Sequence, residues 1–421
     1  EITIQRRGIE LKALIGGTLI DGTGRPTIQD SAILIDGGLI KKVGPSGSVE
    51  MPDDTEIINI SGMTVMPGMI DCHDHLSAQG YDLASRWGLH EPNSLQNLRT
   101  ATVLKDTLAA GYTCVRDAGG LDAGFKMAVE EGLYPGPRLV LSIGIISPTG
   151  GLADRVSGSG HGHHHFDPRL PSGVADGIDA IRSKVREMAR SGADVIKFAT
   201  TGGASSRPGH GPLDIEYTPQ ETRALVEESN SLGRKTMCHA VGGPGLRMCI
   251  EAGTNSVEHG CYLGEDPDLL KMMADNGIFF VPTFEVYEFH STVSAPHMKV
   301  RAQALMEIHK DSMHQALAAG VKVVAGTDAG GFVHGDNARE VELLVQKGMS
   351  NMQAIQATTG WAAECVGLEN EIGTITPGKL ADLLVIAGDP LKDISILRNP
   401  EKMNLIMKNG DIFVNKLPSD K

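Results

Sequence analysis

A chain of 421 residues can form one large barrel domain with a smaller one beside it, and its 41% of hydrophobic residues is a globular composition. The 38 Lys and Arg against 52 Asp and Glu give a formal net charge of -14, which argues against nucleic acid or an anionic membrane as the main partner. No apolar run is long enough to cross a membrane.

The first predicted elements are short strands joined by turns. The segments ALIGGTLIDGTGRP and SAILIDGGLIKKVG are apolar runs interrupted by Gly-Gly, Asp-Gly and Gly-Arg-Pro, which are turn signals. The C-terminal segments GTITPGKLADLLVIAGDPL and MNLIMKNGDIFVNKL have the same character. We therefore predict a small β-sandwich built from residues 1–65 and 371–421, which flank a central domain over residues 66–370.

The central domain repeats one unit, in which a helical stretch ends at Gly and a short apolar run follows. VREMARSG precedes ADVIKFATTGG, and MHQALAAG precedes VKVVAGTDAGG. Gly suits the left-handed end of a helix, and a short branched run is typical of a parallel strand buried on both faces. With residues 63–75 and 137–146 there are eight candidate strands, which predicts an α/β fold, a (β/α)8 TIM barrel. A doubly wound open sheet is the alternative, disfavoured because no phosphate-type glycine motif follows the first strand.

Polar side chains stand at the carboxyl ends of the predicted strands. Arg116 and Asp117 follow the second strand, and six further residues follow the first, fourth, fifth, sixth and eighth: His73, His75, Lys197, His239, His259 and Asp328. The carboxyl ends of barrel strands form one rim, where the chemistry of such proteins takes place. An isolated His-x-His pair is weak evidence, but this convergence predicts that His73 and His75 are metal ligands.

The ordered motifs resemble the amidohydrolase superfamily over nearly the whole chain. VMPGMIDCHDH is similar to that superfamily's entry into its first barrel strand. GYTCVRDAGG, GADVIKFATTGG, SVEHG, GTDAG and GTITPGKLADLLVI resemble its subgroup related to imidazolonepropionase. That subgroup includes prolidases and carboxypeptidases acting on dipeptides, and GTDAGGFVHGDNARE is similar to zinc-dependent arginine carboxypeptidases. Several hydrolases of xenobiotic amides, carbamates or ureas also resemble the subgroup.

The resemblance implies two divalent metal ions per chain. The buried metal would be held by His73, His75 and Asp328, and the more exposed one by His239 and His259, with Lys197 bridging both as a carbamate. The residues agree, because a lysine on the buried strand DVIKF should have a lowered pKa, and its neutral amine can react with CO2. Such nitrogen and oxygen ligands suit Zn²⁺, with Co²⁺, Mn²⁺ or Fe²⁺ possible. Asp328 would take a proton from the attacking water and pass it to the leaving nitrogen.

Several of these residues keep a second interpretation. Lys197 is alternatively a solvated lysine at a strand end. Arg116 is either a salt-bridge former or a substrate contact, and Asp117 either supports a ligand or occupies a plain turn. Cys238 and Cys261, beside ligands, are interpreted as packing residues. All six cysteines are expected to be reduced, which favours a cytoplasmic protein.

One segment departs from the pattern of the dipeptide-cleaving relatives. These usually carry a histidine after the glycine pair that follows the third strand, where this chain has Leu152 in SPTGGLADRVSGSGHGHHHFDP. Four histidines follow in the same glycine-rich loop: His161, His163, His164 and His165. The loop is interpreted either as a solvated, flexible loop or as a lid in which a histidine or Arg155 contacts the substrate.

The first prediction is a binuclear metal-dependent hydrolase that cleaves a C–N amide bond in a dipeptide or N-acyl amino acid. A hydrolase of a xenobiotic amide, carbamate or urea is the alternative, and a non-catalytic barrel is disfavoured because all six candidate ligands are present. A substrate carboxylate needs a cation or several donors, for which Arg207, Tyr287 and His334 are the candidates. We expect a small-molecule substrate and a homo-oligomer.

Overall fold

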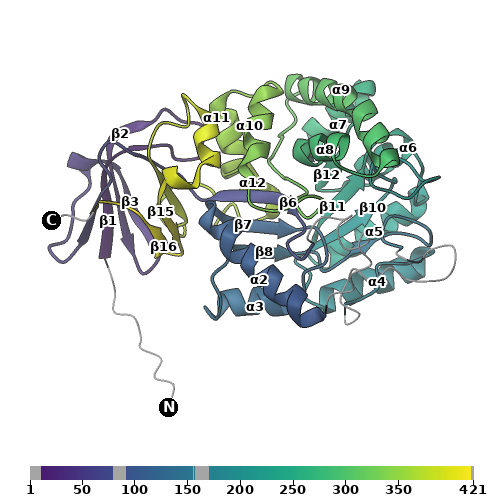
Figure 1. Ribbon diagram of the computed structural model, residues 1–421, viewed down its shortest axis with the longest axis horizontal. Helices are drawn as coiled ribbons and strands as arrows, with labels where there is room; N and C mark the ends of the chain where they lie inside the picture. Colours follow the sequence, from purple (N-terminus) through teal and green to yellow (C-terminus); the bar gives the residue numbers. More distant parts are fainter. Residues whose placement is uncertain (1–10, 79–91, 155, 157–169, 419–421) are drawn as a thin grey trace, which may run out of the picture.

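The computed structural model describes residues 11–78, 92–154, 156 and 170–418 (Figure 1). The predicted loop residues Arg155 and His161–His165 lie outside these ranges. Figure 1 shows a β-sheet at one end of the molecule and a larger part with strands and helices at the other. Among the residues that the structure describes, none of the helices combines the length and the apolar character that a membrane crossing needs.

The first and last strands of the chain share one mixed sheet. Its members are β1 (Leu11–Leu19), β2 (Ile28–Asp36), β3 (Leu39–Pro45), β4 (Glu56–Asn59), β5 (Thr64–Pro67), β14 (Leu383–Ile386), β15 (Met403–Lys408) and β16 (Asp411–Asn415). Their order is β16-β15-β14-β5-β1-β2-β3, with β4 beside β1. The antiparallel pairing of β14 with β5 joins the two ends of the chain. Leu14, Ile33, Val65, Leu383 and Leu405 are buried in one cluster that stabilises this sheet.

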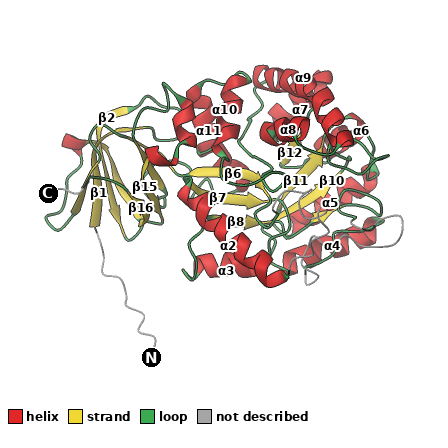
Figure 2. Cartoon of the chain, in the orientation of Figure 1, coloured by secondary structure: helices red, strands yellow, loops and turns green. Residues whose placement is uncertain are grey.

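The larger part alternates parallel strands with helices, which lie around the strands in Figure 2. The strands are β6 (Met69–Asp74), β7 (Tyr112–Asp117), β8 (Arg138–Leu141), β9 (Ile145–Ile146), β10 (Val195–Ala199), β11 (Lys235–Ala240), β12 (Ser256–His259) and β13 (Phe279–Val281). β6, β7 and β8 form one parallel sheet, and β9 to β13 form another in chain order. This arrangement is a TIM-barrel-type α/β fold, as the sequence predicted.

The helices follow the strands as the repeated unit requires. They are α2 (Asn93–Ala109), α3 (Ala123–Glu130), α4 (Ile178–Arg190), α5 (Pro219–Ser231), α6 (Gly243–Glu251), α7 (Pro267–Asn276), α8 (Phe284–Thr292), α9 (Pro296–Ala318), α10 (Ala338–Gln346), α11 (Asn351–Ala357) and α12 (Gly360–Val366). Gly277 ends α7 with a φ of 66°, the left-handed conformation expected of glycine at this place. Short 3-10 turns lie at η1 (Ser46–Ser48), η2 (Leu263–Glu265), η3 (Ile394–Arg398) and η4 (Pro400–Lys402).

Two predicted strands differ from regular strands. Residues 137–146 are divided into β8 and β9, and Ile143 between them has a φ of 67°. β8 pairs with β7, whereas β9 pairs with β10. Residues 321–329 form only single parallel bridges, Val323 with Phe280 and Ala329 with Asp74. The backbone there leaves extended geometry at Asp328, whose φ is 56°, because the chain turns at this residue.

Candidate metal centre

The six predicted ligands lie together at the carboxyl ends of the strands. His73 is on β6, Lys197 on β10, His239 on β11 and His259 on β12. His75 directly follows β6, and Asp328 lies in the segment of residues 321–329. The Lys197 Nζ is 3.4 Å from His73 Nε2. Asp328 Oδ1 is 3.6 Å from His73 Nε2 and 3.4 Å from His75 Nε2. The His259 ring centroid is 5.2 Å from that of His73 and 4.4 Å from that of His239.

Three of the histidines are held through their Nδ1 atoms. His73 Nδ1 is 2.6 Å from Glu258 Oε2, and His75 Nδ1 is 2.8 Å from the carbonyl oxygen of Gly119. His259 Nδ1 is 2.8 Å from Thr283 Oγ1. Partners of this kind fix the tautomer and the ring orientation of metal-binding histidines. The Nε2 atoms of these rings are therefore the ones available to a metal.

Burial sets the protonation of the centre. It lowers the pKa of His239 to about 3, and it lowers the pKa values of His73 and His259 well below the usual value. Neutral imidazole is the form that binds metals. Burial also lowers the pKa of Lys197 to about 8, which favours the neutral amine. Lys197 is 1% exposed, which contradicts the alternative of a solvated lysine.

The donor set fits a divalent metal ion. Ligand atoms of His73, His259 and Asp328 lie within 4.8 Å of one another, and all three residues are buried. Imidazole nitrogens with a carboxylate oxygen are the usual ligands of zinc and similar ions. Neutral imidazole rings beside a carboxylate therefore suit a divalent metal ion at this place.

Arg116 is a salt-bridge former and not a substrate contact. Its guanidinium is 1% exposed, and its Nη2 donates to Glu258 Oε1 at 3.0 Å. Its Nη1 donates to Ser256 Oγ at 3.1 Å, and its Nε donates to the carbonyl oxygen of Cys72. Glu258 thus connects Arg116 to His73. The sequence analysis missed Glu258, although an acidic residue inside the buried strand SVEH is a signal that could have found it.

Carboxylates next to the centre hold the loops that carry it. Asp117 accepts backbone N–H groups of Leu76, Gly119 and Leu121, so it supports His75 through the carbonyl group of Gly119. This favours the supporting role for Asp117 over the plain turn. Burial raises the pKa of Asp117 to about 7.

A second carboxylate network lies under the segment that carries Asp328. Asn337 donates to Asp71 at 3.0 Å and to Asp74 at 2.9 Å. Asp71 also accepts the hydroxyl group and the backbone N–H of Thr327. The sequence analysis singled out none of these four residues, because nothing in their spacing indicates that they meet.

The three predicted substrate contacts lie in different environments. Tyr287 is buried on α8, and its ring centroid is 6.1 Å from that of His259. His334 Nε2 is 2.7 Å from Asp74 Oδ1, so this ring is tied to the carboxylate network. Arg207 lies in an exposed loop and donates to the carbonyl oxygen of Gly150 at 3.0 Å. Tyr287 is thus the candidate that the structure brings next to a predicted ligand.

The loop with Leu152 is joined to the loop after β10. The Leu152 N–H donates to Glu216 Oε1 at 2.7 Å, and His210 Nε2 is 3.0 Å from the same oxygen.

The buried cysteines agree with the packing interpretation, since Cys238 and Cys261 are both 0% exposed. Burial raises the pKa of Cys261 to about 12, which leaves its thiol protonated.

Comparison with known proteins gives consistent matches. Residues 64–413 match the sequence model described as the amidohydrolase family. The chain is 29% identical to ochratoxinase of Aspergillus niger, over 98% of this chain and 90% of that protein. It is 24% identical to imidazolonepropionase of Rhizorhabdus wittichii, over 86% and 90%. A solved structure of a Xaa-Pro dipeptidase with methionine bound in its active site superposes with a TM-score of 0.87, at 30% identity, over 96% of this chain and 100% of that chain.

Proposed function

The chain belongs to the amidohydrolase family, in the subgroup related to imidazolonepropionase, and is a metal-dependent hydrolase of C–N bonds; from this premise we propose that its substrate is a dipeptide or an N-acyl amino acid. The observation that carries the hydrolytic centre is the buried cluster in which Asp328 Oδ1 lies 3.4 Å from His75 and Lys197 Nζ lies 3.4 Å from His73. The substrate class is supported by the 30% identity with a Xaa-Pro dipeptidase along almost the whole chain.

We assign the ligands to two metal ions, most simply Zn²⁺. His73, His75 and Asp328 would hold one ion, His239 and His259 the other, and Lys197 would bridge them as a carbamate formed with CO2. His239 Nε2 is 3.2 Å from the carbonyl oxygen of Gly202, so its Nδ1 is the ring nitrogen that we assign to the metal. Bound divalent metals at such a centre supply Lewis-acid activation of a water molecule and of the substrate carbonyl group.

Asp328 is assigned the proton transfer. Its Oδ1 faces the Nε2 atoms of His73 and His75, so the carboxylate lies where the reaction would take place. The carboxylate takes a proton from the attacking water and gives it to the amide nitrogen, which is a poor leaving group until it is protonated. Asp328 is 8% exposed, and this burial keeps bulk water from competing for that proton.

We further propose that the strands close a (β/α)8 barrel, with β8 and β9 counting as one strand. The bridges of Val323 to Phe280 and of Ala329 to Asp74 support closure by residues 321–329, between β13 and β6. The small domain is proposed as a β-sandwich from residues 1–65 and 371–421, around the barrel domain of residues 66–370. A cytoplasmic location and a homo-oligomeric state remain predictions, the first supported by six buried cysteines without disulfides.

A xenobiotic amide, carbamate or urea is the second candidate substrate, and two features favour it. Leu152 replaces the histidine that we expect of a dipeptide-cleaving enzyme. Leu213 and Ile215 in the loop after β10 are 50% and 51% exposed, and Val333 in the loop after residues 321–329 is 63% exposed. Exposed apolar side chains on loops at this end of the strands suit an apolar, uncharged substrate.

A matched set of substrates decides between the two. We expect faster hydrolysis of dipeptides and N-acetyl amino acids than of their amides and methyl esters, with arylamides and carbamates slower still. If a carboxylate is recognised, replacing its anchor among Arg207, Tyr287 and His334 should raise KM for the free acid and spare the ester. Preference for neutral arylamides or carbamates would instead establish the second candidate.

A further inference from the structure

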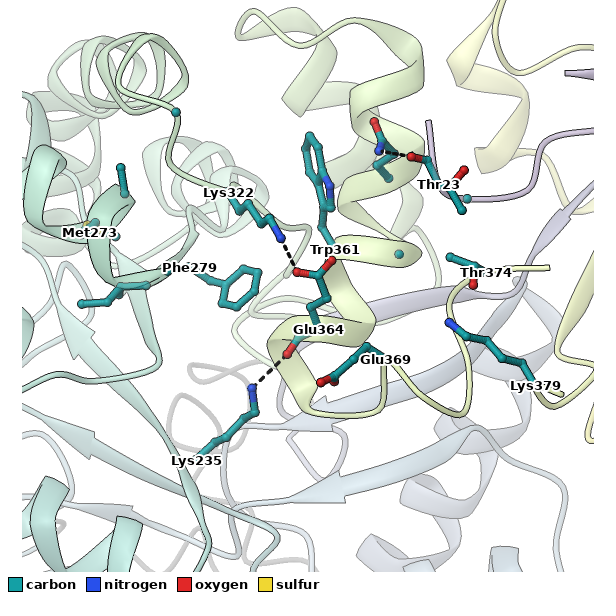
Figure 3. A pocket seen from close by; sticks show the side chains of 17 residues that line it. Thr23, Lys235, Met273, Phe279, Lys322, Trp361, Glu364, Glu369, Thr374 and Lys379 are labelled. Carbon is teal, nitrogen blue, oxygen red and sulfur yellow. Dashed lines mark hydrogen bonds and ion pairs between the residues drawn. The ribbon is translucent and has the colours of Figure 1, made fainter. Parts of the chain in front are cut away.

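A cavity of about 640 Å³ lies at the amino ends of the strands (Figure 3). It is lined by Lys235, the first residue of β11, by Phe279, the first residue of β13, and by Lys322, which precedes Val323. The metal centre is at the carboxyl ends of the same segments, at His239 and after Thr327. The cavity is therefore separate from the proposed active site, and nothing in the proposed reaction uses it.

The other walls come from segments next to β1 and β14, in the sheet that joins the two ends of the chain, and from α12. Thr23 lies between β1 and β2, Lys379 precedes β14, and Trp361 and Glu364 are on α12. Figure 3 shows the Trp361 ring and the Phe279 ring among these polar side chains. The volume lies within the range of about 300–1,000 Å³ that is usual for small-molecule sites.

The lining carries more positive than negative charge. Lys235, Lys322 and Lys379 face the cavity together with two acids, Glu364 and Glu369. The lining therefore has an excess of one positive charge, in a chain whose formal net charge is -14. A ligand that carries one negative charge would neutralise the lining, whereas a cation would be repelled.

The lysines also retain donors for such a ligand. Lys235 Nζ donates to the carbonyl oxygen of Glu364 at 3.0 Å, and Lys379 Nζ donates to the carbonyl oxygen of Ile372 at 3.2 Å. Lys322 Nζ pairs with the Glu364 carboxylate and lies 5.9 Å from the centre of the Phe279 ring. An ammonium group has three N–H donors, so within the described part of the chain each lysine keeps two for other partners.

We propose that this cavity is a second ligand site, which binds a small monocarboxylate with an aromatic body. The carboxylate is held through a charge-assisted hydrogen bond by the Lys322 ammonium group, which lies beside the Phe279 ring. The aromatic body packs against Trp361 and Phe279, which supply apolar surface beside those charges. Glu364 limits the affinity, because its carboxylate competes with the ligand for Lys322.

Intrinsic fluorescence tests the proposal directly. The chain has two tryptophans, Trp87 and Trp361, so a Trp87→Phe variant reports from the cavity alone. We expect phenylacetate to change its fluorescence in a saturable way. The uncharged probe 2-phenylethanol should bind at least ~10-fold more weakly, since it lacks the charge that the lysines recognise. Calorimetric titration of the unaltered protein with phenylacetate should give the same affinity.

Substitutions in the cavity separate this site from the metal centre. Lys322→Gln should weaken phenylacetate binding by ~5- to 10-fold and Lys379→Gln should weaken it less, whereas Glu364→Gln should strengthen it by a few-fold because Lys322 loses its competitor. Lys310→Gln is the matched control, because Lys310 is similarly exposed and lies outside the lining.

The metal-stripped protein should bind phenylacetate as the loaded protein does. Absence of a saturable signal, or binding that needs the metal and ignores the lysine substitutions, would overturn the proposal. These measurements require no turnover, so their outcome does not depend on the proposed hydrolase activity.

Discussion

The buried pair of Arg116 and Glu258 contributes separately to folding stability and to the orientation of His73. Replacing Glu258 with Leu tests both contributions. Glu258 accepts a hydrogen bond from Arg116 at 3.0 Å and faces His73 Nδ1 at 2.6 Å. Both side chains are almost fully buried, at 1% and 0% exposure. The pair therefore stabilises the fold only while both charges are present, and it also orients a predicted metal ligand.

The expected losses follow from that geometry. Glu258→Leu leaves the Arg116 guanidinium buried without its counter-charge, which costs about 3–5 kcal/mol of folding free energy. It also removes the acceptor of His73 Nδ1, and loss of such a partner typically lowers metal affinity by about 10- to 100-fold. The double variant Arg116→Met/Glu258→Leu removes both charges, so most of the stability should return while the metal affinity stays low.

The assay uses urea unfolding of metal-stripped protein, so that bound metal does not contribute to stability. Metal affinity is measured separately by competition with a chromogenic chelator. Equal stability of the wild type and Glu258→Leu would show that Arg116 does not need this counter-charge. Unchanged metal affinity in both variants would refute the role of Glu258 in orienting His73.

Three further predictions follow from single residues. Lys197→Ala should lose metal and activity together, and short carboxylic acids should partly restore turnover; a variant with normal metal content and rate would exclude the bridging role. Asp328→Asn should lower kcat by at least ~10²-fold and affect KM less, as steady-state kinetics would show, because a positioned proton-transfer group is lost. Burial lowers the pKa of Lys408 from 10.5 to about 8. The charged form therefore destabilises the folded protein fully below pH 8, and this destabilisation is lost as the pH rises to 10.5. The stability of Lys408→Met relative to the wild type should therefore fall by about 3 kcal/mol between pH 7 and pH 11, and a pH-independent difference in urea midpoints would contradict this.

The places of the proposed ligands on the strands could be predicted, because strand ends are local features, whereas their metal-binding role stays a prediction. Gly192 closes the helix before β10, and the apolar run that follows ends soon after Lys197, so the position of that lysine needs no tertiary information. The same reasoning places His239 one residue before the end of β11 and His259 at the end of β12. The TIM-barrel-type fold follows from the repetition of this unit.

The supporting contacts could not be predicted, because they join residues that are distant in the sequence. Arg116 and Glu258 are separated by 142 residues, and Asp71 and Asn337 by 266. Only the folded chain brings them together. The interpretation of His334 had the same difficulty, since its contact with Asp74 spans 260 residues, and a histidine in a polar loop is equally compatible with a substrate contact.

Among the described residues, six that are not glycine have a positive φ, and three of them lie at this rim. His259, Thr283 and Asp328 have φ angles of 73°, 56° and 56°, a region that costs a residue with a side chain roughly 1–3 kcal/mol. Glycine would remove that cost, but it would also remove the imidazole, the hydroxyl group and the carboxylate that meet there.

The neighbouring contacts hold these conformations in place. His259 Nδ1 contacts Thr283 Oγ1 at 2.8 Å, and the Asp328 N–H donates to the carbonyl oxygen of His73 at 2.7 Å. The buried Glu340 accepts the N–H groups of the two residues after Thr283, at 3.0 and 2.9 Å, and so fixes the start of α8. Hydrogen bonds thus secure an unfavourable backbone conformation at the ends of three neighbouring segments, where stability alone would favour glycine, and this fits the proposed role of the side chains there.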